Sequence, residues 1–162
     1  MQQSIRFLVL GCLLLAAAGC EPQDRRPGLW LSGEIADTPK EWSFVADYPE
    51  IFVETRPWYG IPFSVTTVAA ARNGKLYVPS IYDGEKPFPG NKYWNSVIAD
   101  NPEVRLKIGG RIYEMRATWV RDIAEYREGA RALADKYESW ARWLEDEDSA
   151  PTFVIIRMEP RG

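Results

Sequence analysis

Two hydroxyl side chains are expected to face each other across a β-hairpin. Asn73-Gly74 is the preferred two-residue hairpin turn, because both positions tolerate positive φ, and it joins strands expected over Ser64 to Arg72 and Lys75 to Ile81. This turn pairs residues whose numbers sum to 147, so Thr67 is expected opposite Ser80. The two hydroxyls can bind a phosphate or another ligand oxygen together, or they can simply hydrogen-bond to each other across the strands.

Two basic side chains stand beside aromatic residues. Arg56 follows a strand expected over Ile51 to Thr55 and precedes Pro57-Trp58-Tyr59, where an arginine can bind a phosphate or stack on a planar ring. Lys92 and Trp94 open a helix expected from Lys92 to Ala99, whose free amides favour an anion. The simpler interpretations stay open: an exposed arginine at a strand end, and an aromatic residue that belongs to the core.

The composition excludes several other kinds of site. The chain of 162 residues has no histidine, which excludes catalysis by a Ser-His-Asp or Cys-His group and ligation of zinc or haem by histidine. A formal net charge of -3 gives no electrostatic footprint for nucleic acid. No pair of acidic residues is placed for general acid–base work, and no spacing matches a metal site. We therefore expect no metal, no haem and no nucleic-acid partner, and we assign no catalytic residue.

The first twenty residues have the three parts of a secretory signal. Arg6 provides the basic start, an apolar run follows from Phe7 to Gly19, and small residues end at Cys20. The run of 13 residues is shorter than the roughly 20 that a membrane-spanning helix needs. A cleaved export signal is therefore expected over residues 1–19, and the rest of the chain is expected to be exported.

Ala17-Ala18-Gly19-Cys20 resembles the lipobox of bacterial lipoproteins, in which the cysteine receives a diacylglyceryl group and becomes the new N-terminus. The resemblance implies a membrane anchor at Cys20 in the cell envelope, with the domain in the periplasm. Glu21 is not the aspartate that often retains such proteins in the inner membrane, so the outer membrane is favoured. Residues 20–37 are rich in proline, glycine and polar residues, and we expect a lipidated tether there.

Residues 38–162 are expected to form one domain of the α+β class. Val104, Leu106 and Ile108 alternate with basic residues, Gly109-Gly110 makes a turn, and a second alternating strand is expected from Arg111 to Arg121. A last strand is expected from Thr152 to Glu159. Five or more strands with tight turns favour an antiparallel barrel or sandwich.

A second helix is expected to begin at the N-cap Asp122, since Glu125 stands three positions on, as in a capping box. Apolar residues then recur at steps of three and four as far as Leu144, so the helix presents one apolar stripe. We expect this stripe to cover the sheet; a dimer contact is the alternative.

The order of these elements resembles a known family. Lys75-Leu76-Tyr77-Val78-Pro79-Ser80 is followed by Trp94, by Asn101-Pro102 and by the strand pair that turns at Gly109-Gly110. This arrangement is similar to the split β-barrel group that contains pyridoxamine phosphate oxidase-like flavoproteins and deazaflavin-dependent nitroreductases. The similarity covers roughly residues 51–122.

The resemblance implies an antiparallel split β-barrel with two helices, which binds FMN or a deazaflavin in a groove between the subunits of a homodimer. By position, Thr67 and Ser80 match the side of the flavin phosphate, Trp94 matches a tryptophan of the deazaflavin branch, and Lys92 approximates the basic phosphate contact. Arg56 is the fifth candidate for cofactor binding. Hydride transfer by a bound flavin needs no histidine.

Two functions follow from these observations. The first is a membrane-anchored oxidoreductase that holds a flavin or deazaflavin with the five named residues. The second is a cofactor-free periplasmic lipoprotein that binds a small ligand or an envelope protein through tryptophan- and tyrosine-rich surfaces such as Trp58-Tyr59. Convergence of the five residues on one groove favours the first function, and their scatter favours the second.

Overall fold

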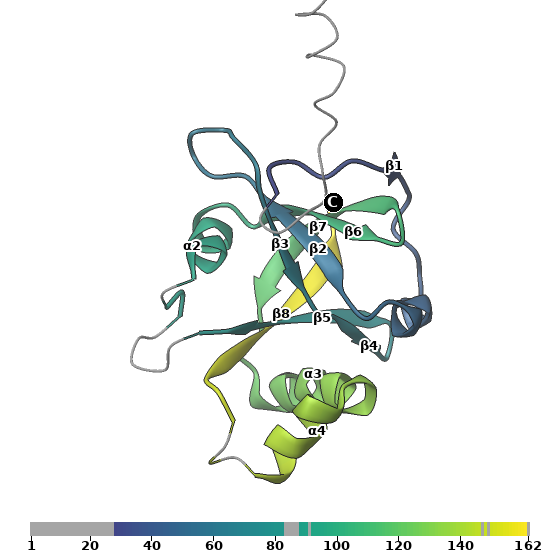
Figure 1. The fold of residues 1–162 in the computed structure, drawn as a ribbon, viewed down its shortest axis with the longest axis vertical. Helices are drawn as coiled ribbons and strands as arrows, with labels where there is room; N and C mark the ends of the chain where they lie inside the picture. Colours follow the sequence, from purple (N-terminus) through teal and green to yellow (C-terminus); the bar gives the residue numbers. More distant parts are fainter. Residues whose placement is uncertain (1–27, 83–87, 91, 147, 149, 162) are drawn as a thin grey trace, which may run out of the picture.

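A computed structural model describes residues 28–82, 88–90, 92–146, 148 and 150–161. Eight strands form one sheet in the order β3-β2-β6-β7-β8-β5-β4, and β1 pairs with β7 (Figure 1). The pairing of β1 is parallel, and the others are antiparallel. The strands are β1 (Glu34–Ile35), β2 (Ile51–Thr55), β3 (Phe63–Thr67), β4 (Ala70–Arg72), β5 (Lys75–Ile81), β6 (Glu103–Ile108), β7 (Arg111–Trp119) and β8 (Phe153–Pro160). The expected antiparallel α+β architecture is confirmed.

The sheet curls so that β3, at one edge, comes to lie beside β5. Among the described residues no ladder joins these two strands. Thr67 Oγ1 donates a hydrogen bond to the carbonyl oxygen of Pro79 across this junction, at 3.4 Å. We call the junction between β3 and β5 the seam, because there the curled sheet meets itself without a continuous ladder.

The predicted hairpin register is confirmed close to its turn. Arg72 pairs with Lys75, and the ladder ends at the pair Ala70–Tyr77. The single strand predicted from Ser64 to Arg72 is wrong, because the chain leaves β3 after Thr67 and crosses to β4 at the other edge of the sheet. The pairing of β3 with β2 draws it away from the hairpin. Thr67 and Ser80 are therefore not ladder partners, although both remain at the seam.

Helix α2 (Tyr93–Asp100) joins β5 to β6, α3 (Ile123–Lys136) and α4 (Glu138–Glu145) join β7 to β8, and a short 3-10 helix, η1, covers Ser43–Asp47. The predicted N-cap is confirmed, since the side chain of Asp122 accepts a hydrogen bond from the backbone N–H of Glu125 at 2.8 Å. The Glu125 carboxylate, which would complete a capping box, bonds instead to Arg157 and Lys75. Figure 1 shows α3 and α4 together below β4, β5 and β8. The middle of the apolar stripe covers the sheet, as Leu133 and Trp140 are buried there.

The single long helix predicted from Asp122 is wrong, because Tyr137 has extended backbone angles that separate α3 from α4. Long-range contacts explain the break. Lys136 Nζ donates to the carbonyl oxygens of Val45, Tyr48 and Ala69 at 2.7 to 2.8 Å. Tyr137 Oη donates to the carbonyl oxygen of Ala69 at 3.2 Å. These bonds turn α4 so that the Trp140 ring packs against Phe153.

The chain from Gly28 onward lies against the sheet. Gly28 forms an isolated β-bridge with Ser64 of β3, and Leu31 is almost fully buried. The backbone N–H of Leu31 donates to Glu54 Oε2 at 2.5 Å. The second half of the predicted tether therefore packs on the domain, whereas its lipid attachment residue, Cys20, lies outside the described residues.

Candidate functional site

A cavity of about 390 Å³ opens at the seam. Residues of β3 form one wall and residues of β5 the opposite wall, while the start of α2 and one side chain of α4 complete the lining. The described residues around it are Val65, Thr66, Thr67, Val68, Pro79, Ser80, Ile81, Lys92, Trp94 and Trp140. Its volume lies within the range of roughly 300–1,000 Å³ that small-molecule sites occupy.

Two hydroxyl groups of this seam cavity are buried without a hydrogen-bond partner among the described residues: Ser80 Oγ and Thr66 Oγ1. The Ser80 residue is only 3% exposed. A buried hydroxyl that makes no hydrogen bond costs about 1–3 kcal/mol, so native proteins rarely keep one without a reason. A ligand oxygen in the cavity would supply the missing partner.

The charge of the seam cavity favours an anion. Lys92 is the one charged side chain among the described lining residues, and no carboxylate is among them. Lys92 is also the N-cap of α2, and no side chain caps the first turn of this helix. Backbone N–H groups at the start of a helix attract negative charge. A phosphate group therefore matches this end of the cavity.

The apolar part of the lining comes from two tryptophans, Trp94 and Trp140, which reach the cavity from different helices. Both are largely buried, and Trp94 also belongs to the barrel core. Together with the hydroxyls and Lys92 they give the cavity a polar, cationic side and an aromatic side. This combination of side chains fits a ligand that carries a phosphate and an aromatic ring.

The structure brings together four of the five residues that the sequence nominated: Thr67, Ser80, Lys92 and Trp94. Arg56 lines a different cavity of about 220 Å³ beside Asn101, whose side-chain amide donates to the Arg56 carbonyl oxygen at 3.1 Å. Several of the other residues that line this second cavity form ion pairs with one another. Glu54, for example, is buried there and accepts from Arg105 Nη1 at 3.1 Å.

Sequence reasoning missed Thr66 and Trp140 as parts of the site. Strict strand alternation puts Thr66 and Thr67 on opposite faces, but β3 is an edge strand whose end turns away toward β4, and both residues reach the seam cavity. The sequence predicted Trp140 only as a member of the apolar stripe. Its position beside β5 depends on the break at Tyr137, which nothing in the local pattern predicts.

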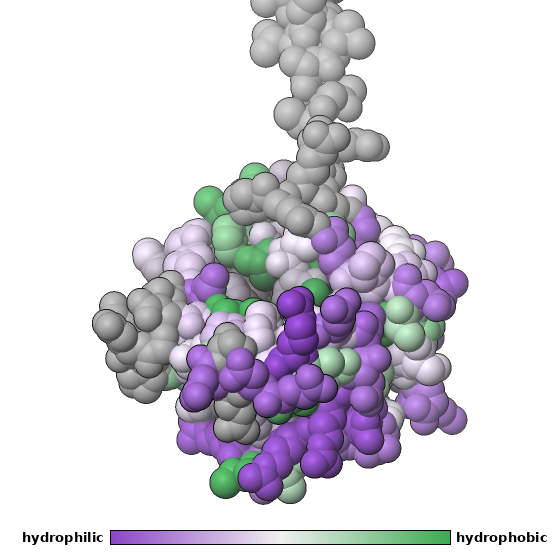
Figure 2. Space-filling view, turned by 60° about the horizontal axis from the view of Figure 1, so that its bottom comes forward, coloured by the Kyte–Doolittle hydropathy of each residue, from purple (hydrophilic) through white to green (hydrophobic). Residues whose placement is uncertain are grey.

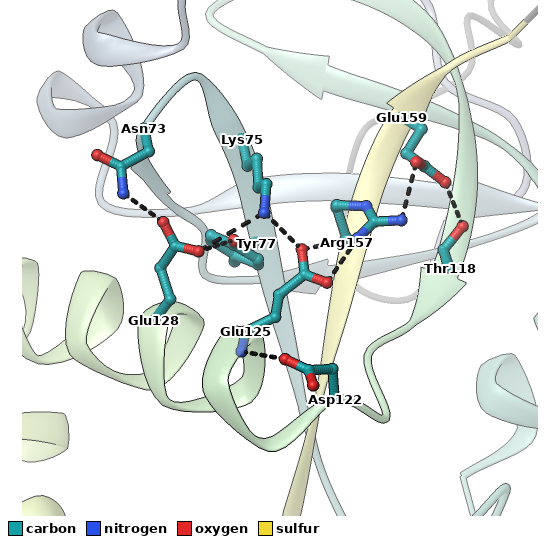
Figure 3. A network of polar contacts seen from close by, with 9 residues as sticks. All are labelled: Asn73, Lys75, Tyr77, Thr118, Asp122, Glu125, Glu128, Arg157 and Glu159. Atoms are coloured by element: carbon teal, nitrogen blue, oxygen red, sulfur yellow. Dashed lines mark hydrogen bonds and ion pairs between the residues drawn. The ribbon is translucent and has the colours of Figure 1, made fainter.

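A second polar cluster fastens α3 to the sheet (Figure 3). Arg157 Nη1 donates to both carboxylate oxygens of Glu125, at 2.6 and 2.7 Å, and Lys75 Nζ donates to Glu125 at 3.0 Å. Tyr77 Oη donates to Glu128 at 3.1 Å, and Lys75 also pairs with Glu128. Both cations drawn in Figure 3 are paired with carboxylates, so the cluster acts as a clamp on the helix.

The ionisation of this clamp follows from its contacts. Burial works to raise the pKa of Glu125, but hydrogen bonds and charge from Arg157 and Lys75 outweigh it and lower the pKa. The hydrogen bond to Glu125 raises the pKa of Lys75 against the effect of burial. Burial, together with the charge of Glu128, raises the pKa of Tyr77. These pKa shifts keep Lys75 and Glu125 charged at neutral pH, and Tyr77 keeps its proton.

Two properties of the described residues bear on binding of a metal ion or a membrane. Within the part of the chain that the structure describes, no group of three or more histidine, cysteine or acidic side chains is arranged to hold a metal ion. None of the described helices is long and apolar enough to cross a membrane. The predicted signal and lipobox lie in residues 1–27, outside the described part of the chain.

Comparison with known proteins identifies the fold. No family model matches the sequence, and no curated protein matches it. A solved protein described as a domain-swapped dimer is similar with a TM-score of 0.55 and 16% identity, over 69% of this chain and 81% of that chain. A Listeria innocua protein provisionally assigned as a pyridoxamine 5'-phosphate oxidase gives a TM-score of 0.52 and 15% identity, over 74% of this chain and 89% of the other.

A FAD-binding protein from Mesorhizobium loti is similar with a TM-score of 0.50 and 16% identity, over 73% of this chain and 83% of that chain. At such low identity these likenesses establish the fold and nothing finer. They confirm the split β-barrel of the α+β class that the order of sequence elements implied.

Proposed function

We propose that the chain is a membrane-anchored lipoprotein whose split-barrel domain binds a flavin or deazaflavin at the seam cavity and acts as an oxidoreductase. The observation that carries the proposal is the convergence of Thr67, Ser80, Lys92 and Trp94 on one cavity. A FAD-binding protein among the structural neighbours supports the same class of cofactor.

Each residue has a defined part in holding the cofactor. Lys92 and the start of α2 would neutralise a phosphate, and Ser80 and Thr66 would donate their hydroxyl protons to ligand oxygens. Trp94 and Trp140 would exclude water from one side of the bound ring system. A bound flavin or deazaflavin supplies hydride transfer, and the protein contributes binding and orientation.

The surroundings of the domain are part of the proposal. Lipid on Cys20 would anchor the chain in the cell envelope, with the outer membrane favoured and the domain in the periplasm. A homodimer would complete the groove around the cofactor, and the neighbour described as a domain-swapped dimer supports this assembly.

The proposal is tested with the purified chain that lacks the predicted signal, residues 1–19. Its absorbance spectrum is recorded first, and flavin fluorescence is then followed during titration with FMN and, separately, with a deazaflavin. We expect saturable quenching at micromolar concentration for one of the two. Absence of a bound chromophore and of any saturable quenching at millimolar ligand would overturn the proposal and leave the cofactor-free lipoprotein as the working description.

A further inference from the structure

Large apolar side chains are exposed together at one end of the domain. Trp58 is 95% exposed, and Ile61 is 57% exposed in the same β2–β3 loop. Tyr59 packs edge-on against Trp58 at 5.6 Å, and its hydroxyl lies 2.7 Å from the hydroxyl of Tyr93. The segment that leads into the domain adds two more. We call the set the aromatic rim: Leu29, Trp30, Trp58, Tyr59, Ile61 and Tyr93.

The two parts of the aromatic rim belong to the same end of the barrel. The loop follows Thr55, the last residue of β2, and precedes β3. Gly28, directly before Leu29, bridges Ser64 at the start of β3, and the residue after Trp30 is bonded to Glu54 at the end of β2. In Figure 1 this loop lies at the end of the molecule opposite α3 and α4. The aromatic rim is thus a feature of one surface.

The charges around the aromatic rim differ from those at the opposite end. Residues 28–33 and 56–62 contain no carboxylate, and their one charged side chain is the cation Arg56. The carboxylates that share a cavity with Arg56 are each paired with another arginine. The end formed by α3 and α4 is covered mainly by hydrophilic side chains, as Figure 2 shows. Tryptophan, tyrosine and aliphatic side chains beside a cation are typical of surfaces that enter the boundary between lipid headgroups and acyl chains.

The length of the N-terminal segment decides which surface the aromatic rim faces. This step rests on the proposed lipid attachment at Cys20. Eight Cα–Cα steps separate Cys20 from Gly28, so the bridge at Gly28 lies at most about 29 Å from the lipidated residue. A domain of this size has a diameter of roughly 37 Å. The segment from Cys20 to Gly28 is therefore shorter than the diameter of the domain. It holds the end that carries the aromatic rim next to the bilayer.

We infer that the aromatic rim docks on the bilayer surface in which the lipid of Cys20 is anchored. Trp58 and Ile61 enter the headgroup boundary, and Arg56 faces the lipid phosphates. The tether raises the effective concentration of the membrane at the rim, so even a weak interfacial affinity is sufficient to keep the domain docked. The domain then has a fixed orientation, with α3 and α4 directed away from the membrane.

The test uses the full chain, expressed with its signal, purified from the membrane fraction, and reconstituted into vesicles of phosphatidylethanolamine and phosphatidylglycerol. The mass of the N-terminal peptide first establishes the lipid on Cys20. Tryptophan fluorescence is then measured in vesicles with and without brominated acyl chains. The difference between the wild type and Trp58→Phe isolates the emission of Trp58, whose side chain touches little of the fold. Trp143→Phe isolates a control tryptophan on α4.

We expect brominated lipids to quench Trp58 at least about threefold more strongly than Trp143, because a side chain docked at the headgroup boundary reaches the acyl chains, whereas α4 is directed away from the membrane. Equal quenching of the two residues in a chain that floats with the vesicles would overturn docking and leave the lipid anchor intact. A chain without lipid on Cys20, which stays behind when the vesicles float, would overturn the anchor and the docking together. Binding of a flavin at the seam cavity is independent of either result.

Discussion

Replacing Ser80 or Thr66 by an apolar residue of similar shape should stabilise the ligand-free protein while it weakens ligand binding. Their hydroxyl oxygens are buried without a partner among the described residues. An unmade hydrogen bond costs about 1–3 kcal/mol, and removing the hydroxyl removes this cost. The small space that the hydroxyl leaves offsets part of the gain in stability. We therefore expect Ser80→Ala and Thr66→Val each to raise the free energy of unfolding by about 1 kcal/mol.

Thr55→Val is the matched control on the neighbouring strand. Thr55 is 1% exposed, and its Oγ1 donates to the carbonyl oxygen of Phe63 at 3.2 Å. Loss of this bond should lower the free energy of unfolding by about 1 kcal/mol, so Thr66→Val and Thr55→Val should differ by about 2 kcal/mol. Urea unfolding followed by tryptophan fluorescence measures all the variants, provided that their m-values agree.

The same variants are then titrated with the cofactor. Loss of one hydroxyl donor should weaken binding by about fivefold in Ser80→Ala, because a net hydrogen bond is worth about 1 kcal/mol. If Ser80→Ala and Thr66→Val destabilise the free protein as much as Thr55→Val does, these hydroxyls already have partners. The argument that they await a ligand would then be refuted.

Three further substitutions test the packing that positions the site. Glu125→Gln should lower the free energy of unfolding by about 2 kcal/mol, because Lys75 and Arg157 lose the carboxylate that they share and each keeps one other carboxylate partner. The pKa of Glu125 is lowered in the folded protein, so its stabilisation is full above the pKa of a free carboxyl and is lost as the pH falls through the folded value. The free energy of unfolding should therefore fall less steeply in acid for Glu125→Gln than for the wild type. Lys136→Met should lower the free energy of unfolding by about 3 kcal/mol, since three backbone carbonyls each lose one hydrogen bond from a charged donor, and thermal unfolding would show it. Gly129→Ala, normally stabilising in a helix, should destabilise α3, because the new Cβ would lie 2.7 Å from Ile155 Cγ2; an unchanged or higher midpoint in urea would contradict this packing.

Local patterns in the sequence predicted much of the fold. Asn73-Gly74 has positive φ at both positions, and the register it implies holds as far as the pair Ala70–Tyr77. The N-cap at Asp122 and the strand alternation that buries Val104, Leu106 and Ile108 also depend only on near neighbours, and both are present.

The errors come from contacts that are distant in sequence. The break at Tyr137 depends on carbonyl groups 67 to 91 residues away from Lys136, and the apolar stripe continues through it without interruption. The division of the predicted strand after Thr67 depends likewise on the pairing of β3 with β2. Hydrophobic periodicity carries no information on such partners.

For the candidate site, the sequence predicted individual residues but not their arrangement in space. The side chains of Thr67, Ser80, Lys92 and Trp94 could be nominated one by one, because hydroxyls, a lysine at a helix start and a tryptophan are chemically suited to a flavin phosphate or ring. Their meeting at the seam depends on the curl of the sheet, which also places Arg56 in a separate cavity.

The most direct test of the central claim compares FMN affinity in Lys92→Ala and Arg56→Ala. Both variants remove one positive charge, but only Lys92 lines the seam cavity. We expect Lys92→Ala to weaken FMN binding at least about tenfold, because a charge-assisted hydrogen bond is worth about 1.5–3 kcal/mol, while Arg56→Ala binds as the wild type does. Equal affinity of Lys92→Ala and the wild type, or a loss confined to Arg56→Ala, would contradict the assignment of the cofactor site to the seam.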